Sequence, residues 1–220
     1  MSTITVYGIP GSPYVRMPLI ACEEKGVPWR LHTLTLEGPK QPEHLARHPL
    51  GRVPAIEHDG WRLYETQAIL RYIDQAFTGP KLTPADARAT ARMSQVMNIV
   101  DWYVHPSLSG AINWNLVIAP MFGLPSDLEA VKAAMPLGRT SIEVLNDLLG
   151  DQPFFSGEQI SLADIMVFPH LEFVPMTDEG RRLLANAPRL APWIERMSER
   201  PSAKRTTMQA LTEPSQSKAA

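Results

Sequence analysis

Val53-Pro54 interrupts an otherwise strand-like run in GRVPAIEHDGWRLYET, residues 51 to 66. The apolar residues on either side of the His-Asp-Gly turn predict a β-hairpin, but proline has no N–H for a strand ladder. If the Val53-Pro54 bond is cis, the N–H and C=O of Val53 point outward, where they are available to the backbone of an extended peptide. A trans proline on an edge strand is the alternative interpretation.

Glu65-Thr66 follows the hairpin and stands where a helix is predicted to begin. The first-turn N–H groups and the positive end of the helix dipole favour a carboxylate, and the Thr66 hydroxyl adds a donor. Glu65 itself can bind an ammonium group. The pair therefore suits a ligand end that carries one charge of each sign, although a simple capping pair is also consistent with the sequence.

Ser12 is a third candidate for ligand binding. It lies in Gly11-Ser12-Pro13-Tyr14, between a predicted strand and a predicted helix. At this corner the Ser12 hydroxyl and the helix amides face any anion placed there. Tyr7 and Tyr14 are rival hydroxyl donors, because Tyr7 ends the strand and Tyr14 lies in the first helical turn. We prefer Ser12 to both.

The elements that position these residues alternate between strand and helix in the first part of the chain. The pattern predicts strands over residues 3–7, 29–36 and the hairpin 53–63, with helices over 12–25, 41–47 and 65–77. This βαβαββα order predicts an α/β domain with a mixed sheet over residues 1–78, and a linker over 79–85. Residues 86–211 show only helical periodicity and predict an all-helical domain, while the polar tail 212–220 is not expected to fold.

Two helix starts in the second part carry capping signals. Thr83-Pro84-Ala85-Asp86 offers an N-cap and a proline for the first helical position. Ser161 and Asp164 are spaced to cap each other's amides as a capping box. Pro106 and Pro120 are expected to kink or end their helices, because neither can donate a backbone hydrogen bond.

The overall composition excludes several classes of protein. The 220 residues are 44% hydrophobic, and a net charge of −2 gives no general attraction for nucleic acid or anionic lipid. The N-terminal MSTITVYG lacks the features of a signal peptide, and the most apolar stretch, 112–122, is too short to span a bilayer, so a cytoplasmic location is expected. The single cysteine, Cys22, excludes an intramolecular disulfide, and we interpret it as a buried apolar residue.

The chain resembles the cytosolic glutathione transferases, and the resemblance spans nearly its whole length. It rests on the Val-Pro strand, the Glu-Thr helix start and the Ser-Leu-Ala-Asp-Ile run at 161–165. The run PEHLARHPLGRVPA at 42–55 is similar to the pattern PEHLxRxPxGxVPA of bacterial and plant phi-like members. The resemblance implies a bacterial phi-like, serine-type detoxification enzyme with a thioredoxin-like first domain, an all-helical second domain and glutathione as co-substrate.

The resemblance also implies a part for each candidate residue in glutathione transfer. It favours the cis form of the Val53-Pro54 bond, so that the cysteinyl backbone of glutathione would pair with Val53. Ser12 would stabilise the glutathione thiolate by a hydrogen bond without taking a proton. Glu65 and Thr66 would bind the γ-glutamyl end. Lys40 and Arg52 would bind the glycyl carboxylate. A pocket for an apolar electrophile would be lined by Gly11, Pro13, Tyr14, Tyr103 and Trp114.

Two residues near the glycyl end depart from the family pattern. Arg52 stands where a glutamine is common, and Pro39 stands where phi members commonly have a histidine. Serine at position 12, in place of the cysteine of glutaredoxin-like and omega-type relatives, argues against thiol-disulfide exchange. Conjugation to an electrophile is therefore the expected reaction.

Other reactions and partners stay open at this point. The same fold serves glutathione-dependent dehalogenation, ether cleavage, isomerisation or peroxide reduction, or a non-catalytic carrier of hydrophobic compounds. The resemblance implies a homodimer, and we expect no metal, nucleic-acid or membrane partner. Arg16 is interpreted as part of a surface or interface salt bridge, His44 and His48 as a solvated helix face, and the basic run 196–205 as a solvated helix end.

Overall fold

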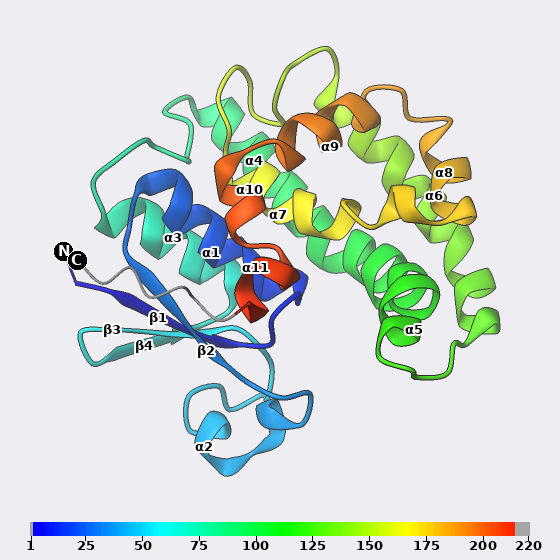
Figure 1. The fold of residues 1–220 in the computed structure, drawn as a ribbon. Helices are drawn as coiled ribbons and strands as arrows, with labels where there is room; N and C mark the ends of the chain where they lie inside the picture. The colour runs from blue at the N-terminus through cyan, green and yellow to red at the C-terminus, as the bar shows by residue number, and fades with distance from the viewer. Residues whose placement is uncertain (1, 214–220) are drawn as a thin grey trace. The chain divides into compact units, whose positions relative to one another are not determined.

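The computed structural model describes residues 2–213 and divides the chain into two compact units. The first unit comprises the residues up to Pro80 together with those from Glu199 onward, and the second comprises Lys81–Ser198 (Figure 1). The first unit holds the sheet, and the second is built from helices. This is the thioredoxin-like α/β fold followed by helices that the sequence predicts.

One mixed sheet organises the first unit, with strand order β2-β1-β3-β4 in the described residues. The strands are β1 (Ile4–Gly8), β2 (Trp29–Thr33), β3 (Ala55–His58) and β4 (Trp61–Tyr64). β1 runs parallel to β2 and antiparallel to β3, which is itself antiparallel to β4. All five residues of β1 are buried, as expected for a central strand covered on both faces.

Two helices pack on one face of this sheet and a shorter one lies on the other (Figure 1). The longer pair is α1 (Pro13–Lys25) and α3 (Thr66–Ala76), and the opposite face carries η1 (Gly38–Lys40) and α2 (Pro42–Leu45). α1 and α3 are joined by a buried ion pair of 3.1 Å between Lys25 and Asp74. The Lys25 ammonium also donates to the Pro80 carbonyl at 2.9 Å, which fixes the end of the unit.

The last part of the chain returns to the first unit through α10 (Pro201–Arg205) and α11 (Met208–Thr212). Arg200 donates to both carboxylate oxygens of Glu24, at 2.7 and 2.6 Å, and Arg205 pairs with Glu23 at 2.8 Å. We expected the helical domain to continue to residue 211 and the basic run to be solvated. The residues from Glu199 onward group with the first unit instead. Within the basic run, Arg196, Lys204 and Arg205 are exposed as expected, whereas Arg200 is only 28% exposed because it pairs with Glu24.

The second unit consists of helices of very different length. They are α4 (Ala87–Ile99), η2 (Val100–Ile118), α5 (Ala119–Met121), α6 (Leu128–Leu149), α7 (Leu162–Leu171), η3 (Val174–Met176), α8 (Asp178–Leu184) and α9 (Leu190–Ser198). Every residue of α7 is buried, so this helix forms the core of the unit.

The predicted capping box at the start of α7 is confirmed. The Asp164 carboxylate accepts from the Ser161 N–H at 2.9 Å and the Ser161 hydroxyl at 2.8 Å. It also accepts from the Phe155 N–H at 3.0 Å and the Trp193 indole at 3.1 Å. Burial raises the pKa of Asp164, while these four hydrogen bonds oppose that shift by stabilising the charged form.

Other predictions for the second unit need correction. The first helix has Asp86 as its N-cap, accepting from the Ala89 N–H at 2.9 Å, so it begins after the Thr83-Pro84 signal rather than at it. Pro106 lies inside η2, a π-helical segment, and Pro120 lies in the first turn of α5. No helix among residues 2–213 is long and apolar enough to cross a membrane.

The predicted tail begins one residue too early, because Thr212 belongs to α11. Residues 214–220 lie outside the described part of the chain. The boundaries of the strands and helices before residue 80 otherwise differ from the predicted ranges by a few residues at each end, as is usual for helix and strand termini.

Candidate functional site

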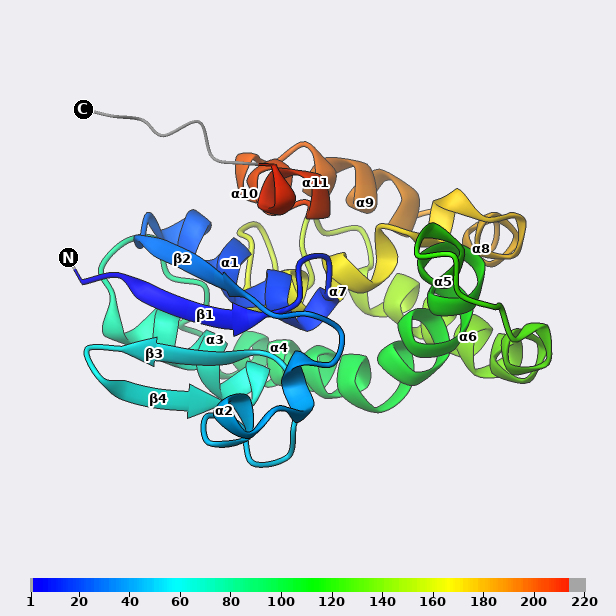
Figure 2. The ribbon, with the colours of Figure 1, turned by 60° about the horizontal axis from the view of Figure 1, so that its bottom comes forward.

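The register of the sheet brings the candidate residues of the first unit to one edge. Tyr7, next to the end of β1, is paired with Ala55, the first residue of β3. Ala55 is also paired with Tyr64, the last residue of β4. The loops that leave β1, enter β3 and leave β4 therefore meet at the same end of the sheet, on the right in Figure 2. They carry Ser12, Val53-Pro54 and Glu65-Thr66, respectively.

Ser12 is the N-cap residue of α1 and has an extended backbone, with φ −61° and ψ 126°. Its carbonyl accepts from the N–H groups of Val15 and Arg16, at 3.1 and 3.0 Å, and so begins the helix. Its side chain makes no capping hydrogen bond to the helix. The hydroxyl is thus at a helix N-terminus without being used as the cap, which leaves it available to an anion.

The Val53-Pro54 bond is cis, as the sequence analysis expected. β3 begins only at Ala55, so Val53 lies just outside the ladder. Neither the N–H nor the carbonyl of Val53 has a hydrogen-bond partner among the described residues. A backbone donor and acceptor thus remain unpaired beside the first pair of the ladder, the position that a visiting extended peptide requires.

Glu65 and Thr66 begin α3 in an unusual backbone geometry. Glu65 is the N-cap and lies at φ 72° and ψ 112°, a conformation that L side chains rarely adopt. Its carbonyl accepts from the Ile69 N–H at 3.0 Å, while its side chain makes no cap bond to the helix. Thr66 is buried at the first helical position. A non-glycine residue held at positive φ is an observation that points to a functional constraint.

The Lys40 side chain lies against the loop that precedes the cis proline. A Cβ on Gly51 would lie 3.0 Å from the Lys40 ammonium, so this cation lies against the residue before Arg52. The Arg52 carbonyl is bonded to His44 Nε2 at 2.7 Å, which ties α2 to the same loop. Lys40 and Arg52 are twelve positions apart in the sequence, and the Lys40 ammonium lies beside the residue that precedes Arg52.

Tyr7 is enclosed by residues that the sequence analysis did not identify. The guanidinium carbon of Arg47 lies 4.2 Å from the Tyr7 ring centroid, a cation–π arrangement, and the His32 ring centroid is 5.0 Å away. Arg47 is bonded in turn to the Glu43 carboxylate at 2.7 Å. Spacing offered one signal for this cluster, because Glu43 and Arg47 are four residues apart on a predicted helix.

Met208 of α11 is a second residue that the sequence analysis missed. Gly11 adopts φ +83°, and a Cβ on it would lie 3.0 Å from the Met208 sulfur. This contact puts a thioether from the end of the chain directly beside the Ser12 corner. No sequence signal indicates it, because the two residues are brought together only by the return of α10 and α11 to the first unit.

Arg16 and Cys22, both on α1, are buried. Burial lowers the pKa of Arg16 to about 10, and its guanidinium donates to the Ala203 carbonyl of α10 at 3.3 Å. The expected surface position of Arg16 is therefore wrong. Cys22 is fully buried, as predicted, and burial raises the pKa of its thiol so that the thiolate is disfavoured.

His44 and His48 are also buried, at 1% and 2% exposure, so the expected solvated face is wrong. His44 bonds the Arg52 carbonyl, and the His48 ring packs on Tyr64 with centroids 4.7 Å apart. Within the described residues no group of three or more His, Cys, Asp or Glu side chains is arranged to hold a metal ion.

The two electrophile-pocket candidates of the second unit lie on η2. Tyr103 is 51% exposed and Trp114 is 38% exposed, so both present aromatic surface. Gly11, Pro13 and Tyr14 belong to the first unit, at the start of α1. Each candidate is thus partly accessible in its own unit, and the pocket stays a prediction.

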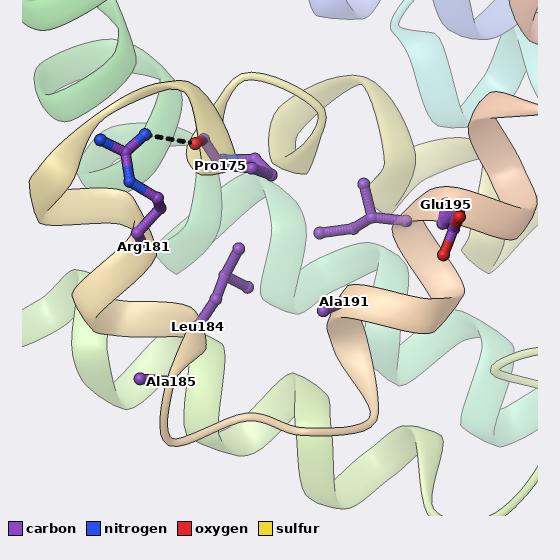
Figure 3. A pocket seen from close by; sticks show the side chains of 7 residues that line it. Pro175, Arg181, Leu184, Ala185, Ala191 and Glu195 are labelled. Atoms are coloured by element: carbon purple, nitrogen blue, oxygen red, sulfur yellow. Dashed lines mark hydrogen bonds between the residues drawn. The ribbon is translucent and has the colours of Figure 1, made fainter.

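A separate hollow of about 460 Å³ lies within the second unit, between η3, α8 and α9 (Figure 3). Arg181 donates to the Pro175 carbonyl at 2.9 Å on one side, and Glu195 lies on the other. None of the residues proposed from the sequence lines this hollow. Its lining is mainly apolar and consists of Pro175, Arg181, Leu184, Ala185, Ala191, Ile194 and Glu195.

Comparison with known proteins matches the chain to glutathione S-transferases. A family model for the glutathione S-transferase N-terminal domain matches residues 6–81, and one for the glutathione S-transferase C-terminal domain matches residues 129–196. Glutathione S-transferase F7 of Arabidopsis thaliana is 26% identical over 210 residues, which cover 93% of this chain and 99% of the relative.

The solved structures that the chain resembles include further glutathione transferases. The crystal structure of poplar glutathione transferase F1 is 26% identical, with a TM-score of 0.82, and the match covers 96% of this chain and 99% of that one. Glutathione S-transferase I from mais, in complex with an atrazine glutathione conjugate, is 25% identical with a TM-score of 0.80, covering 96% and 99%. The similarity therefore extends over both units.

Proposed function

Because the chain belongs to the glutathione S-transferase family and is a transferase enzyme, we propose that the sheet edge of its first unit binds glutathione and activates its thiol for attack on an apolar electrophile. The observation that carries this proposal is the register of β1, β3 and β4. It places an unpaired backbone, a helix N-terminus with an unused hydroxyl and a strained acidic residue at one edge.

In this proposal the tripeptide lies across the edge as an additional short strand. Its cysteinyl N–H and C=O pair with the backbone of Val53, next to Pro54. The γ-glutamyl end meets α3, where Thr66 and the helix N-terminus bind its carboxylate and Glu65 binds its ammonium. The glycyl carboxylate extends in the other direction, toward Lys40, whose ammonium lies against Gly51, and toward Arg52, the next residue. Both ends of the ligand thus meet opposite charge.

Ser12 then stabilises the thiolate at the start of α1. A hydrogen bond to a charged acceptor contributes about 1.5–3 kcal/mol, and a helix N-terminus contributes about 0.3–1 kcal/mol. At about 1.36 kcal/mol per pKa unit, these terms lower a thiol pKa from about 8.5 to about 6–7. The glutathione thiol would then be largely ionised at neutral pH without a general base.

Tyr7 is a poorer candidate for this role because its ring is enclosed by Arg47 and His32. Its hydroxyl belongs to a strand residue that is 8% exposed. Tyr14 lies in the first turn of α1, and with Gly11 and Pro13 we propose it for the electrophile side of the site. Tyr103 and Trp114 of the second unit stay candidates for the same role.

The finer assignments rest on the family. We propose a phi-like, serine-type enzyme, because relatives such as the Arabidopsis F7 protein belong to that series. That it is a bacterial member stays a prediction. We also propose that it acts in the cytoplasm as a homodimer, with glutathione and a small apolar electrophile as its partners and no metal, nucleic acid or membrane.

The test begins with retention on immobilised glutathione and turnover of a panel of aryl halides, isothiocyanates, peroxides and aryl ethers. The panel separates conjugation from dehalogenation, ether cleavage and peroxide reduction. Retention without turnover of any of them would indicate a carrier rather than an enzyme. A protein that neither binds the resin nor turns over a substrate would contradict the proposal.

The role of Ser12 is tested by titrating bound glutathione through the ultraviolet absorbance of its thiolate. Ser12→Ala should move the midpoint back toward the solution value, about 8.5. Ser198→Ala is the matched control, because the Ser198 hydroxyl donates to the Ile194 carbonyl of its own helix at 2.8 Å and has no other partner within residues 2–213. An unchanged midpoint in Ser12→Ala would remove Ser12 from its role.

A further inference from the structure

His48 is a buried histidine that none of the steps above uses. It follows α2, where its N–H donates to the His44 carbonyl at 2.8 Å and its carbonyl accepts from the Gly51 N–H at 2.8 Å. The backbone is therefore fixed on both sides. The residue is 2% exposed, and its ring nitrogen Nδ1 has no hydrogen-bond partner among the described residues. A buried polar atom left unpaired in this way calls for an explanation.

The ring of His48 packs closely on Tyr64 and also stacks on His44, with centroids 6.3 Å apart. The His48 and Tyr64 ring centroids are 4.7 Å apart with an interplanar angle of 36°. Tyr64 is the last residue of β4 and is followed by Glu65, which lies at φ 72°. His48 thus packs on the residue that leads into the strained position.

The charged and titratable groups that act on His48 come from three places. Glu65 at the start of α3 favours the charged imidazolium, while His44 of α2 and Arg52 of the loop disfavour it. Burial has the largest effect and lowers the pKa of His48 below its usual value. At neutral pH the ring is therefore uncharged, so His48 does not compete with a ligand's ammonium for Glu65.

We propose that His48 is a positioning residue for the recognition of the γ-glutamyl ammonium of glutathione, because it holds Tyr64 and so sets the direction of the Glu65 carboxylate. This inference rests on the proposed role of Glu65 in binding that ammonium. His48 itself touches no reacting atom. It links the loop of the glycyl end, through His44 and Arg52, to the γ-glutamyl end.

Protonation of His48 at acidic pH should change the affinity for ligands that carry the amine. A protonated His48 would attract the Glu65 carboxylate and compete with the ligand's ammonium for it. A ligand that lacks the amine would lose nothing by this competition. The ratio of the two affinities, which we call the amine preference, should therefore fall as His48 becomes protonated.

The experiment measures the amine preference by calorimetric titration with glutathione and with its analogue lacking the α-amino group. His48→Ala should reduce the amine preference about tenfold, through loss of the packing that aims Glu65. His48→Phe keeps an aromatic ring against Tyr64 and should restore the preference at neutral pH. Between about pH 7.5 and about pH 5.5 the preference of the wild-type protein should fall, whereas that of His48→Phe should stay flat.

His44→Phe is the matched control, because His44 lies in the adjoining helix α2 and is equally buried, and the phenylalanine keeps an aromatic ring beside His48. It loses the bond to the Arg52 carbonyl, so both ligands should weaken together and leave the amine preference unchanged. Circular dichroism and urea unfolding establish that each variant is folded before its titration is interpreted.

Glu65→Gln separates the two proposals. If Glu65→Gln leaves the amine preference unchanged, the proposed role of Glu65 is wrong, and the inference about His48 fails with it. If Glu65→Gln abolishes the preference while His48→Ala retains it, only the inference about His48 is overturned. Should His48→Ala not fold, the acid profile of His48→Phe decides, because a decline that persists without an imidazole also overturns it.

Discussion

Met208 lies against Gly11, with its sulfur 3.0 Å from the place that a Cβ on the glycine would take. The glycine sits at φ +83°, next to Ser12, and the methionine comes from α11 near the end of the described chain. A side chain at position 11 would therefore meet two obstacles, its own backbone conformation and the thioether.

Gly11→Ala should lower the free energy of unfolding by more than the cost of left-handed backbone alone, which is about 1–2 kcal/mol. Gly26→Ala is the control, because Gly26 lies at φ +68° and a Cβ there would meet nothing within 4 Å. Urea unfolding of both variants, and of Gly11→Ala in a Met208→Ala background, separates the cost of the left-handed backbone from the cost of the contact with Met208. Equal costs at the two glycines, with no coupling to Met208, would show that the contact is unimportant.

Lys40→Ala should weaken glutathione binding about tenfold, because a charge-assisted hydrogen bond to the glycyl carboxylate is lost. The same change should leave the affinity for γ-glutamylcysteine, which lacks the glycine, nearly unaltered. Calorimetric titration with both ligands makes the comparison. Lys204→Ala is the control, since Lys204 pairs with Glu199 at the surface of α10. A similar loss for both ligands would place Lys40 elsewhere in the site or in the fold.

Arg200→Ala should destabilise the protein by about 1–2 kcal/mol at neutral pH by leaving Glu24 without its main partner. Burial alone would raise the pKa of Glu24, but the hydrogen bonds from Arg200 and Ser202 hold it below the usual value. The folded-state pKa is therefore lower than the unfolded one. The resulting stability is present above the unfolded pKa, about 4.3, and is lost as the pH falls through the folded value.

The corresponding measurement is urea unfolding of the wild-type protein and Arg200→Ala at neutral pH and in acid. The difference between them should shrink as the pH falls below about 4. Arg205→Ala should cost less, because Arg205 is 68% exposed where it pairs with Glu23. A difference that stays constant with pH would mean that the Glu24 carboxylate does not contribute through its charge.

Asp164→Asn should lower the free energy of unfolding by about 3 kcal/mol or more. The amide would turn a donor toward a site in which four donors converge, leaving buried N–H groups unpaired. Asp127→Asn is the matched control, because Asp127 caps α6 from an exposed position with one bond to the Ala130 N–H. It should cost no more than about 1 kcal/mol. Chemical unfolding followed by Trp fluorescence gives both values, and similar costs would contradict the buried network.

Cys22 should resist alkylation in the native protein and react only on unfolding. Its thiol is fully buried, and burial raises its pKa so that little thiolate forms. Labelling with iodoacetamide at about pH 8, with and without urea, measures this. Cys22→Ala should retain transferase activity. Rapid labelling of the native protein accompanied by loss of activity would reopen the thiol-disulfide chemistry that Ser12 argues against.

The strands and helices of the first unit were predictable because their signals are local. Alternation in residues 53–63 and the Glu65-Thr66 helix start locate the hairpin and α3. The capping box at Ser161 is equally local, and its hydrogen bonds confirm it. Thr83-Pro84 failed as a helix start because Asp86, three residues later, caps the same helix. Competing caps in one short stretch cannot be ranked from sequence alone.

The errors at the candidate site have a common cause, which is contact between distant segments. α2 spans only Pro42–Leu45, too short for a periodic pattern to show that His44 and His48 are buried. Arg16 is buried because Ala203 lies beside it, 187 positions along the chain. The positive φ of Glu65 is likewise set by its surroundings, since a glutamate carries no local preference for it.

The discontinuity of the first unit bears on how the protein matures during synthesis. A ribosome releases the chain from its N-terminus, so the sheet, α1 and α3 are complete in sequence long before α10 exists. Arg200, the partner of Glu24, is synthesised 176 positions later. Until then the acidic end of α1 faces solvent. The first unit can therefore reach its final form only after the entire helical unit has been translated.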